Sequence, residues 1–150
     1  MTKTKKSELR LFEKLSAILT GFSLADIEGT GMSKTYWQVL RDKEPEGAED
    51  LIQAFQQLKL EPDALTENGL RMIEVVLEDP FLGPLSQQVI MMWYTGQWNF
   101  GSPDTYVISA EAYIQSFSFV AAGSHPAAAK QPGFGTWQFP PQSSKEPQQK

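Results

Sequence analysis

Hydrophobic residues recur three and four positions apart along most of residues 7–121, and this spacing is typical of amphipathic α-helices. Residues 7–20 give the clearest stripe. Ser7 is expected to cap the start of this helix, and Gly21 stands where a glycine commonly ends one. The apolar stripe of the first helix consists of Leu9, Phe12, Leu15, Ile18, Leu19 and Phe22.

Five further stripes predict five more helices. The first of these helices is expected to have Ser33 as its cap and to end just before Pro45, and the next two are expected over 46–60 and 66–78. The last two are expected from Pro84 to Thr95 and from Ser109 to just before Gly123. Residues 29–31 are expected to form a loop, and residues 106–108 are a short β-prone run. The inward-facing residues are expected to be Tyr36, Trp37, Val39 and Leu40, then Leu51, Ile52, Phe55 and Leu58, then Leu70, Ile73, Val76 and Leu77, then Leu85, Val89, Met92 and Trp93, and last Tyr113, Ile114, Phe117, Val120 and Ala121.

The character of the chain changes after Gly123. The segment Q-P-G-F-G-T-W-Q-F-P-P-Q, residues 131–142, sets three large aromatic rings among glycines and prolines, which break helices and weaken strands. These rings must be buried against another surface or stay exposed, and contiguous exposed apolar groups usually mark an interaction surface. The candidate contacts with a partner in this segment are Phe134, Trp137, Phe139, Pro140 and Pro141.

The expected fold class is therefore all-α, a single irregular bundle of about six helices with an extended C-terminal arm rich in glycine, proline and aromatic residues. The helical domain is expected over residues 1–122 and the partner-binding arm over 123–142. Residues 143–150, where glutamine, lysine and proline dominate, are expected to be a disordered tail.

Composition excludes several classes of protein. The chain of 150 residues favours one domain, and its net charge of −5 argues against nucleic acid as a general partner. The sequence contains no cysteine, which excludes disulfides, thiolate metal ligands and cysteine nucleophiles in this chain. No stretch approaches the roughly 20 apolar residues that span a bilayer, so no membrane span is expected.

The N-terminus is not expected to be an export signal. Lys5 and Lys6 are followed by the charged residues Glu8, Arg10 and Glu13 where a signal peptide has an uncharged apolar run. The sequence also contains no twin-arginine pair.

The sequence offers little for catalysis. Its one histidine, His125, precedes a proline in a segment rich in helix breakers, without converging partners for acid–base or metal chemistry nearby. The carboxylate pairs at residues 26 and 28 and at residues 49 and 50 are expected to be solvated, because such close neighbours on a helix do not face each other. We therefore expect no catalytic, cofactor-binding or metal-binding residues, and a chain that is not an enzyme by itself.

The segment V-I-M-M-W-Y-T-G-Q-W, residues 89–98, places Trp93, Tyr94 and Trp98 around the end of one helix. Three large rings in six positions cannot all point the same way. In one interpretation Trp93 faces the core, Tyr94 lies at the rim and Trp98 covers the end of the bundle. In the other, part of this set binds a partner, since Trp and Tyr are enriched at interfaces.

Several segments together resemble a known family. F-E-K-L-S-A-I-L-T-G-F at residues 12–22, W-Y-T-G-Q at 93–97, S-A-E-A-Y-I-Q-S-F at 109–117 and P-G-F-G-T-W-Q-F-P-P at 132–141 occur in order along most of the body. In this order they resemble the small, gamma-type subunit of bacterial membrane-bound, FAD-dependent sugar and polyol dehydrogenase complexes, which include the sorbitol, fructose, glucose and gluconate dehydrogenases.

The resemblance implies a helical accessory subunit without a cofactor of its own. A separate large subunit would hold FAD and oxidise the sugar, and a multihaem cytochrome c subunit, where present, would pass electrons on to quinone. The small subunit would support maturation of the large one in a periplasmic complex at the inner membrane. Family members commonly carry a twin-arginine signal, which this sequence lacks. Three explanations stay open: the signal lies on the partner, it is missing from this version of the chain, or the complex is cytoplasmic.

Two further functions stay open at this point. The chain could be a stand-alone helical domain that binds a small molecule, with the aromatic segment as its pocket. It could also be an adaptor or chaperone without any relation to redox chemistry.

Overall fold

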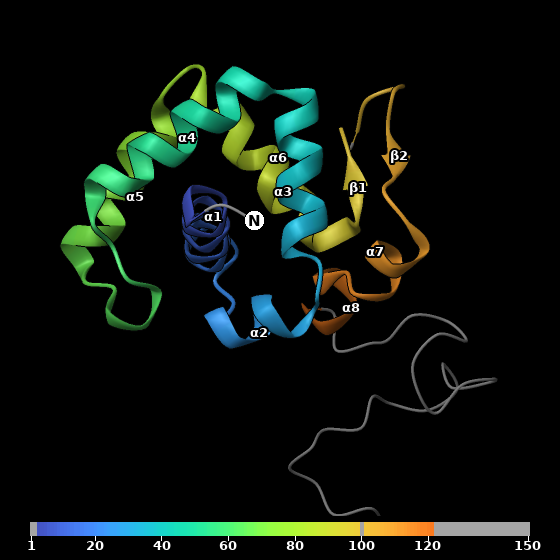
Figure 1. Ribbon diagram of the computed structural model, residues 1–150, viewed down its shortest axis with the longest axis horizontal. Helices are drawn as coiled ribbons and strands as arrows, with labels where there is room; N and C mark the ends of the chain where they lie inside the picture. The colour runs from blue at the N-terminus through green and yellow to red at the C-terminus, as the bar shows by residue number, and fades with distance from the viewer. Residues whose placement is uncertain (1–2, 100, 122–150) are drawn as a thin grey trace, which may run out of the picture.

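Helix α1 (Lys3–Thr20) is the central element of the computed structural model, which describes residues 3–99 and 101–121 (Figure 1). Its residues Phe12 and Leu15 are fully enclosed, as the apolar stripe predicts. The helix ends where predicted, because Gly21 has a left-handed φ of 80° and its N–H donates to the carbonyl of Ala17 at 3.0 Å. The expected start was wrong: α1 begins at Lys3, so Ser7 lies inside the helix and does not cap it.

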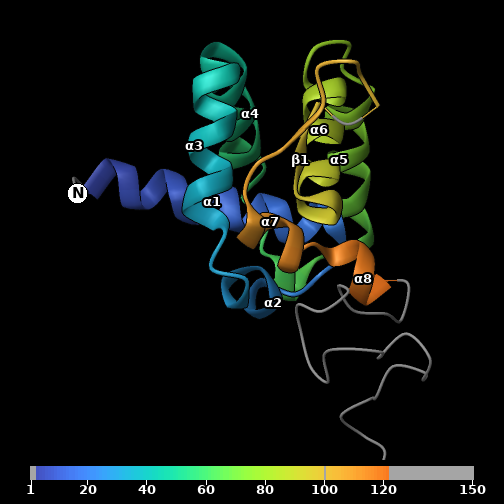
Figure 2. The same ribbon diagram turned by 90° about the vertical axis from the view of Figure 1, so that its right-hand side faces the viewer.

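Four helices surround α1 and correspond to four of the predicted stripes. They are α3 (Ser33–Lys43), α4 (Pro45–Leu58), α5 (Glu67–Glu78) and α6 (Leu82–Thr95). Helix α1 packs against α3, α4 and α6, while α5 packs against α6 on the outer side (Figure 2). The expected cap at Ser33 was wrong, since Met32 precedes α3 without a side-chain hydrogen bond and Ser33 is the first helical residue.

A short helix, α2 (Leu24–Gly29), was not predicted. Ser23 caps it by accepting a hydrogen bond from the N–H of Asp26, and the Asp26 carboxylate accepts one from the N–H of Ser23. The expected loop at residues 29–31 is therefore displaced, because Gly29 ends the helix and the turn follows it. The S-x-x-D spacing was a usable signal for this helix.

The predicted sixth helix is broken into α7 (Ala110–Ile114) and α8 (Phe117–Ala121). At Gln115 the backbone leaves the helical conformation, with φ −90° and ψ 5°. A continuous helix would put Tyr113 and Phe117, four residues apart, on one face. In the structure Phe117 is buried while Tyr113 is 41% exposed, so the expected inward position of Tyr113 was wrong. The break turns Phe117 onto Phe22, with ring centroids 4.0 Å apart.

Helix α5 buries a different face from the one predicted. Gly69 and Ile73 are buried and Val76 is partly buried, but Leu70 and Leu77 are 49% and 37% exposed. The apolar residues of α5 span a wider arc than its neighbours cover, with Leu70 and Leu77 at one edge, so periodicity alone could not select the part that is buried. Contact with α6 and α4 selects it instead.

The remaining elements are small. Pro62–Ala64 forms a 3-10 turn, and strands β1 (Gln97–Trp98) and β2 (Tyr106–Val107) pair antiparallel, with Trp98 opposite Tyr106. The described residues thus form an all-α, irregular helical bundle, as predicted. The expected arm at 123–142 and the expected tail at 143–150 lie outside them.

Candidate interaction surface

Trp93 lies in the core, on α6, with 1% of its surface exposed. The ring of Tyr36 on α3 meets it edge-on at a centroid distance of 4.7 Å, and the ring of Phe117 lies parallel to it at 5.7 Å. Residues 89–98 had two interpretations, as part of the core or as a contact with a partner. The burial of Trp93 supports the first for this residue. Its side chain is not on the surface of the described residues.

Tyr94 lies at the rim of the bundle. Its ring meets Phe22 at a centroid distance of 5.8 Å, and its hydroxyl donates a hydrogen bond to the carbonyl of Thr20 at 3.1 Å. The aromatic body is thus packed while the polar tip satisfies a carbonyl at the end of α1, where helical carbonyls lack internal partners.

Gly96 makes the joint after α6 possible. It caps the helix with a left-handed φ of 69°, and a Cβ here would lie 2.5 Å from the carbonyl oxygen of Ala112 in α7. Only glycine allows this close approach of two backbones. The chain then turns into β1, which carries Trp98 to the far side of α6.

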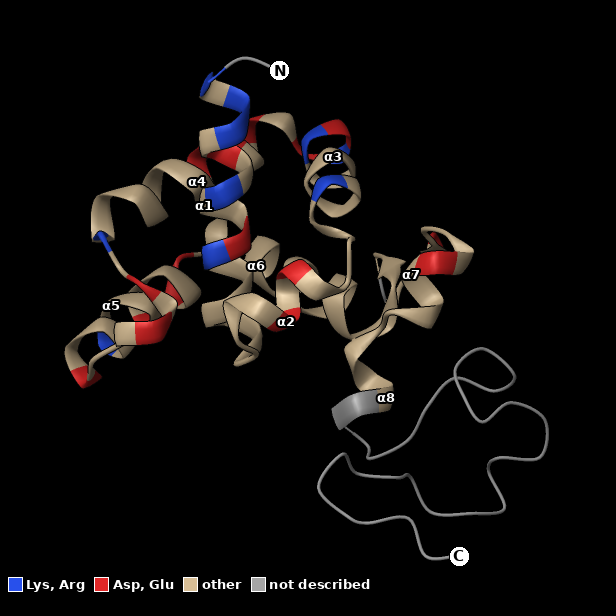
Figure 3. Cartoon of the chain, turned by 60° about the horizontal axis from the view of Figure 1, so that its bottom comes forward, with Lys and Arg blue, Asp and Glu red and all other residues tan. Residues whose placement is uncertain are grey.

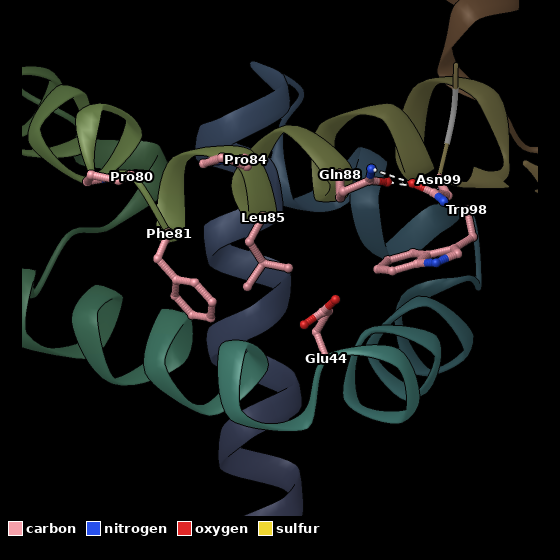
Figure 4. A pocket seen from close by; sticks show the side chains of 8 residues that line it. All are labelled: Glu44, Pro80, Phe81, Pro84, Leu85, Gln88, Trp98 and Asn99. Carbon is pink, nitrogen blue, oxygen red and sulfur yellow. Dashed lines mark hydrogen bonds between the residues drawn. The ribbon is translucent and has the colours of Figure 1, made fainter. Parts of the chain in front are cut away.

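Trp98 is 9% exposed and forms one wall of a cleft of about 330 Å³. The cleft lies between the first half of α6 and the turn from α3 to α4 (Figure 4). The residues that line it are Glu44, Pro80, Phe81, Pro84, Leu85, Gln88, Trp98 and Asn99. Of the three predicted contact residues of this segment, Trp98 is the one that borders this cleft.

The opposite wall is built by Phe81 and Leu85. A Cβ at Gly47 would lie 2.8 Å from Leu85 Cδ2 and 3.5 Å from Phe81 Cζ, so the absence of a side chain there lets α4 approach both residues. Phe81 is nevertheless 54% exposed. The N–H groups of Phe81 and Leu82 both donate to Asp79 Oδ1, at 2.9 and 2.8 Å. These two hydrogen bonds lower the pKa of Asp79, because they favour its charged form.

The polar end of the cleft is a pair of amides. Gln88 Nε2 donates to Asn99 Oδ1 at 3.3 Å, and the N–H of Asn99 donates to Gln88 Oε1 at 3.1 Å (Figure 4). Asn99 itself has a left-handed φ of 60°. The two bonds hold α6 and the end of β1 in a single arrangement.

Sequence reasoning did not single out Glu44, Phe81, Gln88 or Asn99. The sequence predicted a helix that ends at residue 78, and the turn that follows it, at Asp79 and Pro80, presents Phe81. No local pattern links these residues, because they come from three separate stretches of the chain.

Charge is unevenly distributed along the chain. Residues 44–99, which include α4, α5, α6 and the whole described lining of the cleft, contain ten acidic and two basic residues. Lysine and arginine gather instead on α1 and α3 (Figure 3). Glu44 is the one charged residue among the described residues that line the cleft, so the lining favours a positively charged ligand.

A second cavity, of about 290 Å³, lies between α2 and the α7–α8 joint. The residues that line it are Phe22, Ala25, Asp26, Gly29, Thr30, Gln115 and Phe117. The only acidic group among them, Asp26, already caps α2. This cavity therefore offers less polar chemistry than the cleft at Trp98.

The four carboxylates noted as pairs in the sequence are all exposed, and three of them have structural partners. Asp26 caps α2, Glu28 pairs with Arg10, and Glu49 accepts a hydrogen bond from Gln53 at 2.8 Å. Within the described ranges, no three His, Asp or Glu side chains come together in a group that could hold a metal ion. None of the helices in the same ranges is long and apolar enough to cross a bilayer.

The other predicted contacts, Phe134, Trp137, Phe139, Pro140 and Pro141, lie outside the described residues, as does His125. Comparison of the chain with protein-family models, with curated proteins and with solved structures found no match.

Proposed function

We propose that this chain is the non-catalytic small subunit of an FAD-dependent sugar or polyol dehydrogenase complex, in which it binds the FAD-carrying large subunit and supports its maturation. A multihaem cytochrome c would be a third component in such a complex. The observation that carries the proposal is the ordered set of four motifs that resemble the small subunits of these complexes.

The positions of these motifs support the proposal. W-Y-T-G-Q contains the buried Trp93 and the left-handed Gly96, and S-A-E-A-Y-I-Q-S-F contains Ala112, whose carbonyl leaves room only for a glycine at position 96. Two motifs that are distant in sequence thus depend on each other for packing. Residues that the family resemblance brings together are also interdependent in this fold.

A cleft with an exposed aromatic rim is a further support. Phe81 and Trp98 flank a cavity whose one charged residue in the described lining is acidic, and aromatic residues are enriched where proteins bind one another. An accessory subunit needs such a surface in addition to its own core.

The proposal predicts a neighbouring reading frame for an FAD-dependent oxidoreductase, and co-expression of the chain with that protein would test it. We expect both chains to elute together in size-exclusion chromatography, with flavin absorbance in the shared peak and dye reduction by sugars or polyols only in that peak. The large subunit expressed alone is the control and should give less soluble, flavin-loaded protein. Separate elution, with equal flavin content in the presence and absence of the small chain, would contradict the proposal.

A further inference from the structure

The carboxylate of Glu44 points into the cleft. Glu44 lies between α3 and α4, and its side chain makes no capping hydrogen bond to α4. In Figure 4 the carboxylate lies between the ring of Phe81 on one side and the indole of Trp98 on the other. No ion pair is formed by Glu44 within the described part of the chain.

Neighbouring cations are engaged elsewhere. Lys43 places its ammonium 5.3 Å from the ring centroid of Tyr106, and Arg41 lies near Glu8 at 3.9 Å. Neither residue lines the cleft. The negative charge of Glu44, an exposed residue, therefore borders a cavity lined by aromatic, apolar and amide side chains without a cation of its own among the described residues.

We propose that this cleft binds an arginine side chain presented by a protein partner. Glu44 would accept a bidentate hydrogen bond from the guanidinium, and the faces of Trp98 and Phe81 would stack against its planar cation. The amide oxygens of Gln88 and Asn99 each accept one hydrogen bond in the structure and have a second lone pair for an N–H of the guanidinium.

Charge and shape favour a basic protein partner as the occupant of the cleft over a small cation, a second copy of the chain or the chain's own C-terminal segment. The one charged residue of the described lining is the acidic Glu44, and residues 44–99, which supply that whole lining, contain ten acidic and two basic residues, so the cleft attracts a basic group. Phe81 is more than half exposed at the rim, which suits burial under a protein surface. Arginine also differs from lysine in presenting a planar fork that can both stack and pair with a carboxylate.

This inference goes beyond the proposed function, because it names the side chain that the cleft takes and applies whichever protein presents it. A titration of the ¹⁵N-labelled full chain tests it, with the indole N–H signal of Trp98 as the readout. The probes are the blocked amino acid N-acetyl-arginine-N-methylamide and its uncharged analogue N-acetyl-citrulline-N-methylamide. We expect a concentration-dependent shift of the Trp98 signal with the arginine compound and none with the citrulline compound.

Glu44→Gln should abolish this shift, whereas Glu46→Gln should retain it. Glu46 is a matched control, since it is an exposed carboxylate in the first turn of the same helix but does not line the cleft. Equal shifts with the two probes, or an unchanged shift in Glu44→Gln, would overturn the proposal. A larger response to agmatine than to the blocked arginine would assign the cleft to a small cation and would overturn the protein partner.

Two controls without a probe separate the remaining occupants. A Trp98 signal that moves on dilution would show that a second copy of the chain fills the cleft. A Trp98 signal that moves in the Trp137→Ala, Phe139→Ala double variant would show that the C-terminal segment of the same chain fills it. Either result would overturn the proposal. If the chain binds the arginine compound but no flavoprotein co-purifies with it, the assignment of the cleft stands. That result would contradict only the proposed function as a dehydrogenase subunit.

Discussion

The hydroxyl of Tyr94 donates a hydrogen bond to the carbonyl oxygen of Thr20 at 3.1 Å, and so joins the last turn of α6 to the last residue of α1 across 74 positions of sequence. Few polar contacts in the described residues connect such distant parts of the chain. Most of the interior is instead an apolar and aromatic cluster in which Trp93 contacts α1, α3 and α8 through Phe12, Tyr36 and Phe117.

Removal of this hydroxyl in Tyr94→Phe should destabilise the protein modestly. We expect the free energy of unfolding to fall by about 1 kcal/mol, because the Thr20 carbonyl loses its partner while the ring packing against Phe22 remains. Urea denaturation followed by circular dichroism measures the change. Tyr113→Phe is the control, since Tyr113 is exposed, and the same loss in both variants would contradict the prediction.

Gly96→Ala should be much more harmful than Gly31→Ala. Both glycines have a φ near 70°, so each alanine variant bears a conformational cost of about 1–2 kcal/mol. Only Gly96 also faces a backbone carbonyl, that of Ala112, whereas nothing lies within 4 Å of a Cβ at Gly31. Forcing a methyl group into that contact should add about 1–3 kcal/mol. Equal thermal midpoints for the two variants would show that the α6–α7 joint relaxes freely.

Ser86→Ala should stabilise the protein. The hydroxyl of Ser86 is completely buried and has no hydrogen-bond partner within the described ranges. Its removal relieves a desolvation cost and places a better helix former in α6, so we expect a gain of about 0.5–1 kcal/mol. Ser109→Ala should do the opposite, with a loss of about 1 kcal/mol, because Ser109 caps α7 by accepting from the N–H of Ala112. Chemical denaturation of both variants checks the two signs, and a loss in Ser86→Ala would indicate a partner for this hydroxyl.

Tyr36 should make the fold sensitive to alkali. Burial raises the pKa of Tyr36 above its ordinary value, because the phenolate is disfavoured away from water. Below the unfolded-state pKa of about 10, Tyr36 is neutral in both states and its stabilisation is fully present. Above that pH the unfolded state ionises first, so stability is lost as pH rises, by up to about 1.4 kcal/mol per pH unit. The urea midpoint should fall between neutral and strongly alkaline pH. This fall should be smaller in Tyr36→Phe than in Tyr106→Phe, which removes an exposed hydroxyl. Identical alkaline losses in the two variants would refute the role of Tyr36.

The double variant Trp137→Ala, Phe139→Ala should weaken the complex more than the fold. This prediction rests on the sequence, in which these rings lie beyond the last periodic helix among glycines and prolines. A large aromatic buried at an interface contributes roughly 2–3 kcal/mol, so the yield of co-purified large subunit should fall at least about tenfold. The thermal midpoint of the isolated chain should shift by a few degrees at most. A collapsed midpoint with normal binding by the remaining folded protein would show that the rings serve this domain's own core.

The sequence by itself determined the class of the fold and most of its helices. The stripe of Phe12 and Leu15 and the stripe of Val89, Met92 and Trp93 are buried as predicted, since a helix with one apolar face has a single favourable orientation in water. The helix ends at Gly21 and Gly96 also follow from local chemistry, because glycine is the residue that adopts a left-handed φ without cost.

Only the tertiary structure decided the break after Ile114, the buried face of α5 and the cleft at Trp98. Periodicity describes one segment at a time, whereas Phe117 leaves its helical register to stack on Phe22, a ring 95 positions away in the chain. The apolar arc of α5 is wider than the stripe that is buried, so contact with its neighbours selects that stripe. The cleft joins Glu44, Phe81 and Trp98 from three distant segments. Their proximity depends on how α4 and α6 pack through Gly47 and Leu85, which no local pattern encodes.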